Sequence, residues 1–225
     1  MLWRRIKKNY RQMKRRLSWS LFRRRHILSR HPEAFIRLRA RQGDVRLHLC
    51  CGTKKYPGYI NIDVVPLEGA DIIMNIPDDL AAIPSECASE ILMESGFEHF
   101  YQYQQDDVLR ECRRILKEEG RLVLKWLPDF DLIVDRYVRH RDRGGADNTF
   151  DLYQVYRYTH AEPTPENSPH QLHKDIFTKD SVRKLLERNG FYIEKLSNEI
   201  FQGETYSVGM NIIAVKPSTA TRGGV

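Results

Sequence analysis

The segment of residues 45–63 constrains the fold of this chain more than any other. Val45–Leu49 is a short apolar run, Cys50–Gly52 are small residues, and Tyr59–Ile62 restores strand character before Asp63. This order predicts a strand, a tight turn and a second strand. In an open α/β sheet, ligands bind beyond the carboxyl ends of the strands, so the glycine and the acid are expected side by side there. The carboxylate would then accept hydrogen bonds from ribose hydroxyls.

The charge of the chain is unevenly distributed. The 225 residues have a formal net charge of +7, but residues 1–41 carry fifteen Lys or Arg against the acid Glu33, so the remainder sums to −7. This length holds one sizeable domain, and a hydrophobic content of 41% is typical of a globular protein. The basic character belongs to an N-terminal extension, which argues against nucleic-acid binding by the globular part.

Cysteine usage and hydropathy indicate the cellular setting. Cys50, Cys51, Cys87 and Cys112 have neither the spacing of a zinc site nor the density of a disulfide scaffold. No apolar run approaches the roughly 18 residues that span a bilayer, and the basic N-terminus lacks the apolar core of a signal peptide. We therefore expect a cytoplasmic protein, with a peripheral position on the inner membrane face as one outcome for its basic extension.

Residues 2–22 have the pattern of a basic amphipathic helix. Apolar side chains recur every three or four residues, with Lys and Arg largely between them. Three interpretations stay open. Residues 2–25 lie on an anionic membrane or an acidic partner, the helix docks its apolar stripe on the same protein, or the extension binds nucleic acid. The first is favoured over the second, and nucleic acid is the least favoured.

Strands and helices alternate along the rest of the chain, which is typical of a doubly wound α/β sheet. We expect strands at residues 45–49, 59–62, 70–76, 90–95, 120–127, 191–196 and 211–215, and helices at 33–41, 106–118, 130–137, 150–158 and 178–189. Loops at 139–148 and 162–169 interrupt this pattern. The expected organisation is a basic helical extension at 1–42, one domain at 43–217 and a flexible tail at 218–225.

Five motifs in the globular part occur in the order of a known family. They are Leu47–Gly52 with Gly58–Asp63, then Phe97–His99, Leu109–Gly120, Leu127–Phe130 and Phe177–Phe191. The first resembles a Leu-Asn-Leu-Gly-Cys-Gly motif that is followed by Gly-Trp/Tyr-Ile-Asn-Val-Asp. The chain is thus similar, over roughly residues 45–216, to class I S-adenosylmethionine-dependent methyltransferases, and in particular to the small bacterial type 11-like group.

The resemblance implies a Rossmann-like seven-stranded sheet with the last strand antiparallel, and S-adenosylmethionine as the cofactor. Asp63 would hold the ribose diol, Asn75 and Ile76 would border the adenine, and Glu94–Gly96 would line the methionine part. A turn of small residues lets the backbone approach a nucleoside closely. The implied cofactor-binding residues are Leu49, Cys50, Cys51, Gly52, Asp63, Asn75, Ile76, Glu94, Ser95 and Gly96.

Three positions depart from the motifs of that family. Cys50 stands at the first motif glycine, Asn75 stands where an Asp is common, and Glu118–Gly120 replaces a Pro-Gly-Gly hairpin. The side chain of Cys50 either narrows the cofactor site or points into the sheet. Narrowing would suit a catalytically silent binding or scaffold module that the extension recruits, whereas the other orientation would suit an active enzyme.

Methyl transfer from a sulfonium to a hydroxyl is an in-line displacement that a nearby base assists. The candidate catalytic residues are His99, His170, His173 and Asp129. Imidazoles titrate near neutral pH, and Asp129 follows the fifth strand at the ligand-binding edge. Each of these residues could instead have a structural role. His99 could be a packing residue, His170 and His173 could be solvated loop residues, and Asp129 could be a turn residue. His170, His173 and Asp175 have only weak metal-ligand spacing, so no metal site is expected.

The sequence therefore favours an S-adenosylmethionine-dependent methyltransferase that methylates a hydroxyl group. A small molecule or a glycan-related compound is the expected substrate, and the glycan part of this expectation draws on the basic extension. Two alternatives stay open, namely the silent Rossmann-like module and a nucleic-acid methyltransferase that the extension guides to its substrate.

Overall fold

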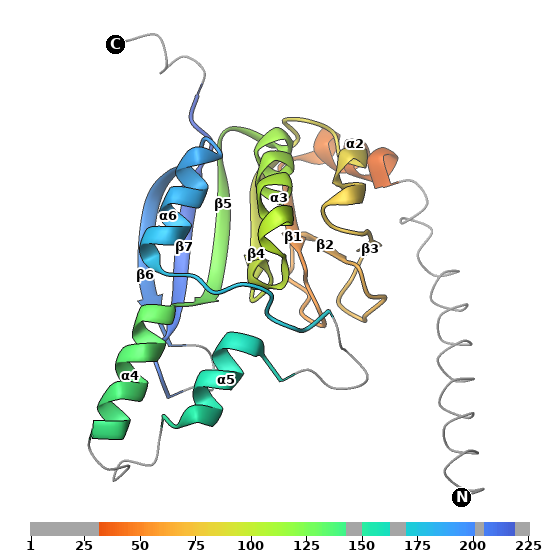
Figure 1. The fold of residues 1–225 in the computed structure, drawn as a ribbon. Helices are drawn as coiled ribbons and strands as arrows, with labels where there is room; N and C mark the ends of the chain where they lie inside the picture. The colour runs from red at the N-terminus through yellow and green to blue at the C-terminus, as the bar shows by residue number, and fades with distance from the viewer. Residues whose placement is uncertain (1–31, 143–149, 163–169, 201–204, 219–225) are drawn as a thin grey trace, which may run out of the picture.

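The computed structural model describes residues 32–142, 150–162, 170–200 and 205–218 (Figure 1). Its helices are α2 (Pro32–Gln42), α3 (Gln102–Ile115), α4 (Phe130–Asp142), α5 (Leu152–His160) and α6 (Lys179–Arg188), with short 3-10 helices η2 (Asp78–Ala82) and η3 (Phe97–His99). Its strands are β1 (Val45–Leu49), β2 (Ile60–Asp63), β3 (Ile72–Ile73), β4 (Ala88–Glu94), β5 (Leu116–Pro128), β6 (Tyr192–Glu199) and β7 (Gly209–Val215).

The seven strands form one sheet in the order β3-β2-β1-β4-β5-β7-β6. β1 to β5 are mutually parallel, and Leu47 in β1 is in register with Ile60 in β2 and Ile91 in β4. β7 runs antiparallel to both β5 and β6. The predicted Rossmann-like sheet with an antiparallel last strand is confirmed.

Helices α3 and α6 lie on one face of the sheet (Figure 1). Val108, Leu109 and Cys112 recur at helical spacing in α3, and all three are completely buried in the core. Thr178 caps α6 by accepting a hydrogen bond from the Ser181 backbone amide. This packing fixes the sheet, so the ends of the central strands are rigid positions for a site.

A second, smaller core lies beyond the carboxyl ends of the parallel strands. It consists of Ile133, Phe150 and Val208, and Figure 1 shows α4 and α5 together at this end of the molecule. The Phe150 ring stacks on Tyr158 with a centroid distance of 5.8 Å. The helices predicted at 130–137 and 150–158 are confirmed, and they form a packed layer at the edge where ligands bind in such sheets.

One predicted boundary between helix and strand is wrong. The helix expected to run to Glu118 ends at Ile115, and β5 begins at Leu116 rather than Gly120. Leu116 is completely buried and pairs with Ala88 of β4. Because this burial and pairing outweigh helix propensity, the glycine sits inside the strand.

The predicted strand at 70–76 is also wrong in length, since β3 comprises Ile72 and Ile73 alone. The chain turns at Asn75, whose backbone N–H donates to the Asp79 carboxylate at 2.7 Å. Its side-chain amide donates to Asp78 at 2.6 Å. These polar contacts lead directly into η2 and end the strand early.

The predicted helix at 2–22 and the residues after Ser218 lie outside the described residues, as do 143–149 and 163–169 of the predicted loops. α2 begins at Pro32, a residue well suited to a first helical position, and Ile36 anchors it in the core. None of the helices that the structure describes is both long and apolar enough to span a bilayer.

Candidate active site

Three strands turn through left-handed residues at the carboxyl edge of the sheet. Cys50 follows β1 with φ 55°, Ser95 follows β4 with φ 48°, and Trp126 has φ 60° close to the end of β5. This conformation costs on the order of 1 kcal/mol or more in a residue with a Cβ atom. Such strain is often found at functional sites. Glu86 and Glu119 at the opposite edge are left-handed as well, so the cavities, rather than this strain, place the candidate site at the carboxyl edge.

A cavity of about 300 Å³ lies against the ends of β1 and β2. Six of the predicted cofactor residues line it, namely Cys50, Gly52, Asp63, Asn75, Ile76 and Ser95. The remaining wall consists of Val64, Val65, His99, Phe100, Tyr101, Gln104, His170, Gln171 and Lys174. The cavity therefore brings the glycine turn and the acid of the first motif into one wall.

Asp63 joins the turn after β1 to the end of β2. Its carboxylate accepts a hydrogen bond from the Gly52 backbone amide and another from the Val65 amide, both at 2.8 Å. The predicted proximity of the glycine and the acid is confirmed. Each carboxylate oxygen has more than one lone pair, so the anchored group keeps acceptor capacity toward the cavity.

Cys50 fits at the first motif position because Gly96 leaves room for it. A β-carbon on Gly96 would lie only 2.8 Å from the Cys50 β-carbon. The Cys50 side chain is half-buried and packs against the main hydrophobic core. Burial raises the pKa of this thiol well above its usual range, which keeps it neutral. Cys50 at the position of the motif glycine therefore does not fill the cavity.

A second cavity, of about 320 Å³, adjoins the first and shares Ser95, His99 and Gln171 with it. Its other wall residues are Glu98, Trp126, Pro128, Arg157, Tyr158, Ala161, Glu162, His173, Val208 and Gly209. They come from η3, the end of β5, α5 and the start of β7. One aromatic ring each from β5 and α5 gives this cavity flat apolar surface beside charged groups.

The segment of residues 172–174 is fixed against η3 by hydrogen bonds. The Lys174 backbone amide donates to the Glu98 carbonyl at 2.9 Å, and its ammonium donates to the His99 carbonyl at 2.9 Å. The imidazole Nδ1 of His99 lies 3.1 Å from the Leu172 carbonyl oxygen. These bonds bring His173 beside His99, with ring centroids 5.1 Å apart.

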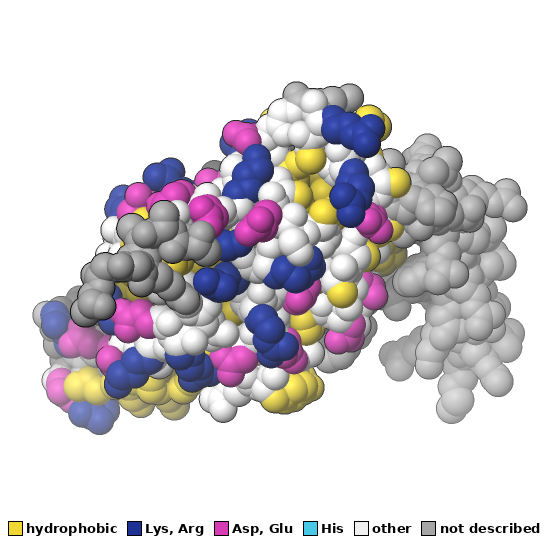
Figure 2. All heavy atoms as spheres, turned by 90° about the horizontal axis from the view of Figure 1, so that it is seen from above, with side chains coloured by type: hydrophobic (Ala, Val, Ile, Leu, Met, Phe, Trp, Pro, Cys, Tyr) yellow, Lys and Arg dark blue, Asp and Glu magenta, His cyan; other side chains and the backbone are white. Residues whose placement is uncertain are grey.

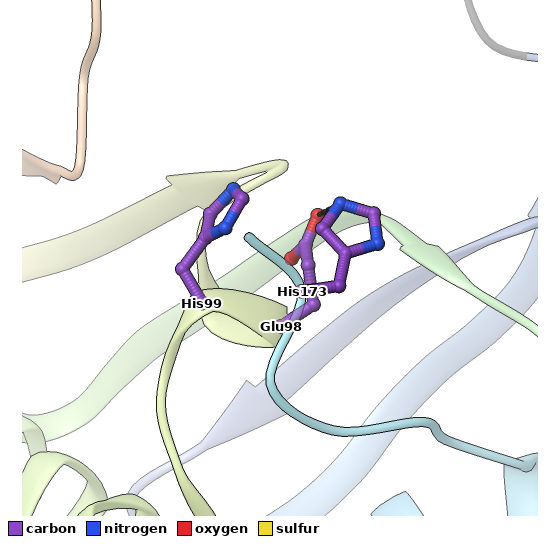
Figure 3. Close-up of side chains that lie close together, drawn as sticks. All are labelled: Glu98, His99 and His173. Carbon is purple, nitrogen blue, oxygen red and sulfur yellow. Dashed lines mark ion pairs between the residues drawn. The ribbon is translucent and has the colours of Figure 1, made fainter. Parts of the chain in front are cut away.

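Glu98, His99 and His173 converge at the wall of the second cavity (Figure 3). His173 Nε2 lies 3.8 Å from a Glu98 carboxylate oxygen. Burial, together with the neighbouring His99, lowers the pKa of His173 to about 4. Burial also raises the pKa of Glu98. His173 is therefore neutral at neutral pH, and its ring keeps a nitrogen lone pair.

Methyltransferases of known structure match the fold of this chain. A putative S-adenosylmethionine-dependent methyltransferase from Listeria monocytogenes matches at a TM-score of 0.52 and 15% identity, over 82% of this chain and 99% of that one. The fold is that of class I methyltransferases. An S-adenosylmethionine-dependent methyltransferase from Archaeoglobus fulgidus matches this methyltransferase fold at a TM-score of 0.50 and 14% identity, over 84% of this chain and 97% of that one.

A third structure with the methyltransferase fold contains ligands. It is the 1,6-didemethyltoxoflavin-N1-methyltransferase of Burkholderia thailandensis, with 1,6-didemethyltoxoflavin and S-adenosylhomocysteine bound. It matches at a TM-score of 0.50 and 11% identity, over 94% of this chain and 90% of that one. No family model matches the chain, and neither does any curated protein sequence. Similarity at these identities establishes the fold.

Four predicted cofactor residues of this methyltransferase fold are absent from the walls of both cavities. Leu49 and Cys51 are buried, and Gly96 accommodates Cys50 from behind. Glu94 is 5% exposed, and its carboxylate accepts hydrogen bonds from Lys54 and Tyr56. These four residues shape and support the strand ends.

The four predicted catalytic residues separate in the structure. His99 lines both cavities, His170 lines the first and His173 lines the second. Asp129 is 1% exposed and lines neither, because its carboxylate accepts a hydrogen bond from the Asn198 side-chain amide at 2.9 Å. Asp175, the third residue of the weak metal spacing, accepts from the Gln105 side chain at 2.8 Å.

Several wall residues were not predicted from the sequence. Trp126, Arg157, Tyr158, Glu162 and Gln171 join the second cavity. Glu98 could have been predicted, since it lies in the Phe97–His99 motif at the turn after β4. The residues of α5 had none, because nothing local predicts that this helix folds back over the sheet edge.

The opposite edge of the sheet is also hollowed, but its charges are compensated. Figure 2 shows Lys and Arg side chains interspersed with Asp and Glu on this face. A groove of about 650 Å³ here includes Arg110, Arg114 and Arg188. Each of these pairs with an acid, and the Arg188–Asp106 distance is 3.0 Å. The adjoining cavities at the carboxyl edge are therefore the better candidate for chemistry.

Proposed function

We propose that this protein is an S-adenosylmethionine-dependent methyltransferase whose cofactor occupies the first cavity and whose acceptor occupies the second. We call these the cofactor cavity and the acceptor cavity. The observation that carries the proposal is their shared wall of Ser95, His99 and Gln171. A methyl donor and an acceptor must meet in line at short distance, and two adjoining cavities allow this contact.

In the cofactor cavity, the polar groups match the parts of a sulfonium nucleoside. Asp63 is held by two backbone amides and would accept hydrogen bonds from the ribose diol. Asn75 and Ile76 would border the adenine at the outer wall, and Ser95 lies toward the junction with the acceptor cavity. This assignment places the sulfonium methyl group near the shared wall.

In the acceptor cavity, we propose O-methylation of a small-molecule or glycan-related substrate. Trp126 and Tyr158 offer faces on which a sugar or an aromatic ring would stack. Arg157 and Glu162 on the same wall would pair with polar substituents, and their own separation is 3.5 Å. The imidazoles at the junction would assist a hydroxyl acceptor, since its proton must leave.

The proposed methyl transfer needs no reactant besides the cofactor, the acceptor and a group that takes the proton. The acceptor oxygen forms a bond to the methyl carbon while the carbon–sulfur bond of the sulfonium breaks. The hydroxyl proton passes to a basic group at the junction, for which His99 is the candidate because it lines both cavities. The products are a methyl ether and the neutral thioether S-adenosylhomocysteine. The protein contributes position and a place for the proton.

A silent binding module is the alternative from a different functional class. Calorimetry with S-adenosylmethionine followed by an assay for S-adenosylhomocysteine release separates the two. We expect saturable cofactor binding, and release of product with members of a panel of hydroxylated small molecules and glycans. A folded sample that does not bind the cofactor at millimolar concentration would exclude the enzyme. Binding without release for any acceptor would favour the silent module.

For the extension, we propose attachment to an anionic membrane surface through residues 2–25, which would place the protein at the inner membrane face. The sequence pattern supports this, and so do the exposed Arg39 and Arg41 at the end of α2, which extend the basic character. Flotation with anionic and neutral liposomes tests it. Equal flotation of the full chain and a variant lacking residues 1–31 would contradict it. Strongly salt-dependent RNA or DNA binding that needs this segment would instead favour a nucleic-acid methyltransferase.

A further inference from the structure

Three side chains on the wall of the acceptor cavity have the donor set of a metal site. A nitrogen of His99, a nitrogen of His173 and a carboxylate oxygen of Glu98 all lie within 4.8 Å of one another. In the part of the chain that the structure describes, this is the one such group of three. All three residues line the acceptor cavity (Figure 3). Two imidazoles and a carboxylate are a common set for catalytic zinc and for non-haem iron.

Backbone carbonyls orient both imidazoles. His99 Nδ1 is 3.1 Å from the Leu172 carbonyl oxygen, and His173 Nδ1 is 3.0 Å from the Tyr158 carbonyl oxygen. A carbonyl accepts a hydrogen bond, so in each neutral ring Nδ1 carries the hydrogen and Nε2 carries the lone pair. Metal-binding histidines are typically held by such outer contacts, which fix the tautomer and the ring orientation.

Glu98 supplies a second, independent indication of a ligand. Glu98 is 2% exposed, and its Oε2 atom is buried without a hydrogen-bond partner. A buried carboxylate in this position is costly unless a cation or a donor satisfies it. The neutral His173 ring presents its Nε2 lone pair rather than a hydrogen toward Glu98, so it cannot satisfy the carboxylate. A cation would satisfy the carboxylate and both lone pairs together.

We propose that Glu98, His99 and His173 bind a divalent transition-metal cation such as Zn²⁺, with its open coordination positions facing the acceptor cavity. Ligand atoms of tetrahedral zinc lie about 3.4 Å apart, given metal–ligand bonds near 2.1 Å. His173 Nε2 lies 3.8 Å from Glu98 Oε1, and all three ligand atoms lie within 4.8 Å of one another, so the side chains would draw together by about 1.4 Å at most to coordinate the cation. Sequence spacing did not predict this group of three, because η3 and residue 173 are far apart in the chain.

Cation binding stands on the geometry, whereas its use in catalysis rests on the proposed function. With the cation in place, the two imidazoles serve as ligands, and the open positions receive an oxygen of the acceptor. Coordination lowers the pKa of a hydroxyl or water, so the acceptor would lose its proton to solvent more readily. The site would thereby select acceptors whose methylated hydroxyl can reach the cation.

The test is a titration of the chelator-treated full-length protein with Zn²⁺ by calorimetry, with Co²⁺ absorption as a spectroscopic probe of the coordination. We expect one specific site per chain. Glu98→Gln and His173→Asn should each weaken Zn²⁺ binding by about 100-fold and change the Co²⁺ spectrum. Glu94→Gln and His160→Asn are the matched controls, a buried carboxylate and an exposed imidazole outside the group. Both controls should retain the affinity.

Folding of every variant is checked by circular dichroism, and His173→Asn decides the result if Glu98→Gln does not fold. Absence of Zn²⁺ and Co²⁺ binding by the wild type would overturn the proposal, and so would equal affinity in the variants and controls. Calorimetry with S-adenosylmethionine on the same sample keeps the two proposals distinguishable. Zn²⁺ binding without cofactor binding would contradict the proposed function alone, and the reverse result would contradict the metal site alone.

Discussion

The two cavities at the carboxyl edge are built from different kinds of chain segment. The cofactor cavity takes much of its wall from residues 50–76, where a turn and two neighbouring strands follow one another closely. The acceptor cavity draws on residues 126–128, 157–162, 171–173 and 208–209, which meet only in the folded molecule. The cofactor cavity can be predicted from the sequence because its residues lie close together in the chain. The acceptor cavity cannot, because its residues come together only when the chain folds.

The two cavities also have different proposed roles. Asp63 and the turn at Gly52 form a fixed set of acceptors and amides, as expected for one constant ligand. The acceptor cavity has aromatic, basic and acidic side chains on separate elements, which suits recognition of a particular substrate. His99 is on both walls and connects the two functions.

The largest expected effect comes from the residue that both cavities share. In His99→Asn, turnover should fall by about 1,000-fold, because the variant loses either a base or a metal ligand beside the acceptor. The affinity for S-adenosylmethionine should change by less than about tenfold, since most of the cofactor wall is intact. Steady-state kinetics and calorimetry measure the two quantities. His160→Asn is the control, and equal turnover in both variants would remove His99 from the mechanism.

A change confined to the cofactor cavity should act on cofactor binding. Asp63→Ala removes the acceptor proposed for the ribose diol, a loss of about 3 kcal/mol for two charge-assisted hydrogen bonds. The dissociation constant for S-adenosylmethionine should therefore rise by about 100-fold. Calorimetry on a sample with an unchanged circular dichroism spectrum tests this. Unaltered affinity would refute the assignment of the diol to Asp63.

A change confined to the acceptor cavity should spare the cofactor. Trp126→Phe reduces the aromatic face of the cavity, so KM for the acceptor should rise by about tenfold, equivalent to about 1.4 kcal/mol. The affinity for S-adenosylmethionine should stay the same. Tyr103→Phe serves as the control, since Tyr103 is 74% exposed and lines neither cavity. A parallel loss of cofactor affinity in Trp126→Phe would show that the two cavities are not separate.

The smallest effect concerns stability at Asp71, which directly precedes β3. Burial raises the pKa of Asp71, but hydrogen bonds from Lys55 and Asn61 outweigh it and leave the pKa below the usual value of 3.8. A lowered pKa in the folded state stabilises the protein above the unfolded value, and this stabilisation is lost as the pH falls through the folded value. Asp71→Asn should cost about 1 kcal/mol at pH 7. Denaturant unfolding should show this difference shrinking below pH 3.8, and a constant difference would contradict the assignment.

The sheet was predictable because its strands are short apolar runs at regular spacing. β1, β4 and β7 follow directly from such runs, and the cap at Thr178 marks the start of α6. The boundary at Leu116 was not predictable, since its pairing with Ala88 depends on contacts far along the chain. Local propensity favoured continuing α3, and tertiary packing decided otherwise.

The site shows the same limit. The pairing of Gly52 with Asp63 was predictable from an acid at the end of the next strand. The fit of Cys50 was not, because it depends on the absence of a side chain at Gly96. Asp129 was expected at the ligand-binding edge, yet the contact with Asn198 holds its carboxylate away from both cavities.

The most direct test is a crystal structure of the full chain with S-adenosylhomocysteine, the product of the proposed donor. We expect the ribose on Asp63, the adenine beside Asn75 and Ile76, and the sulfur directed toward Ser95 and His99 at the shared wall. A nucleoside bound in the acceptor cavity, or a sulfur directed away from the shared wall, would contradict the assignment of the two cavities.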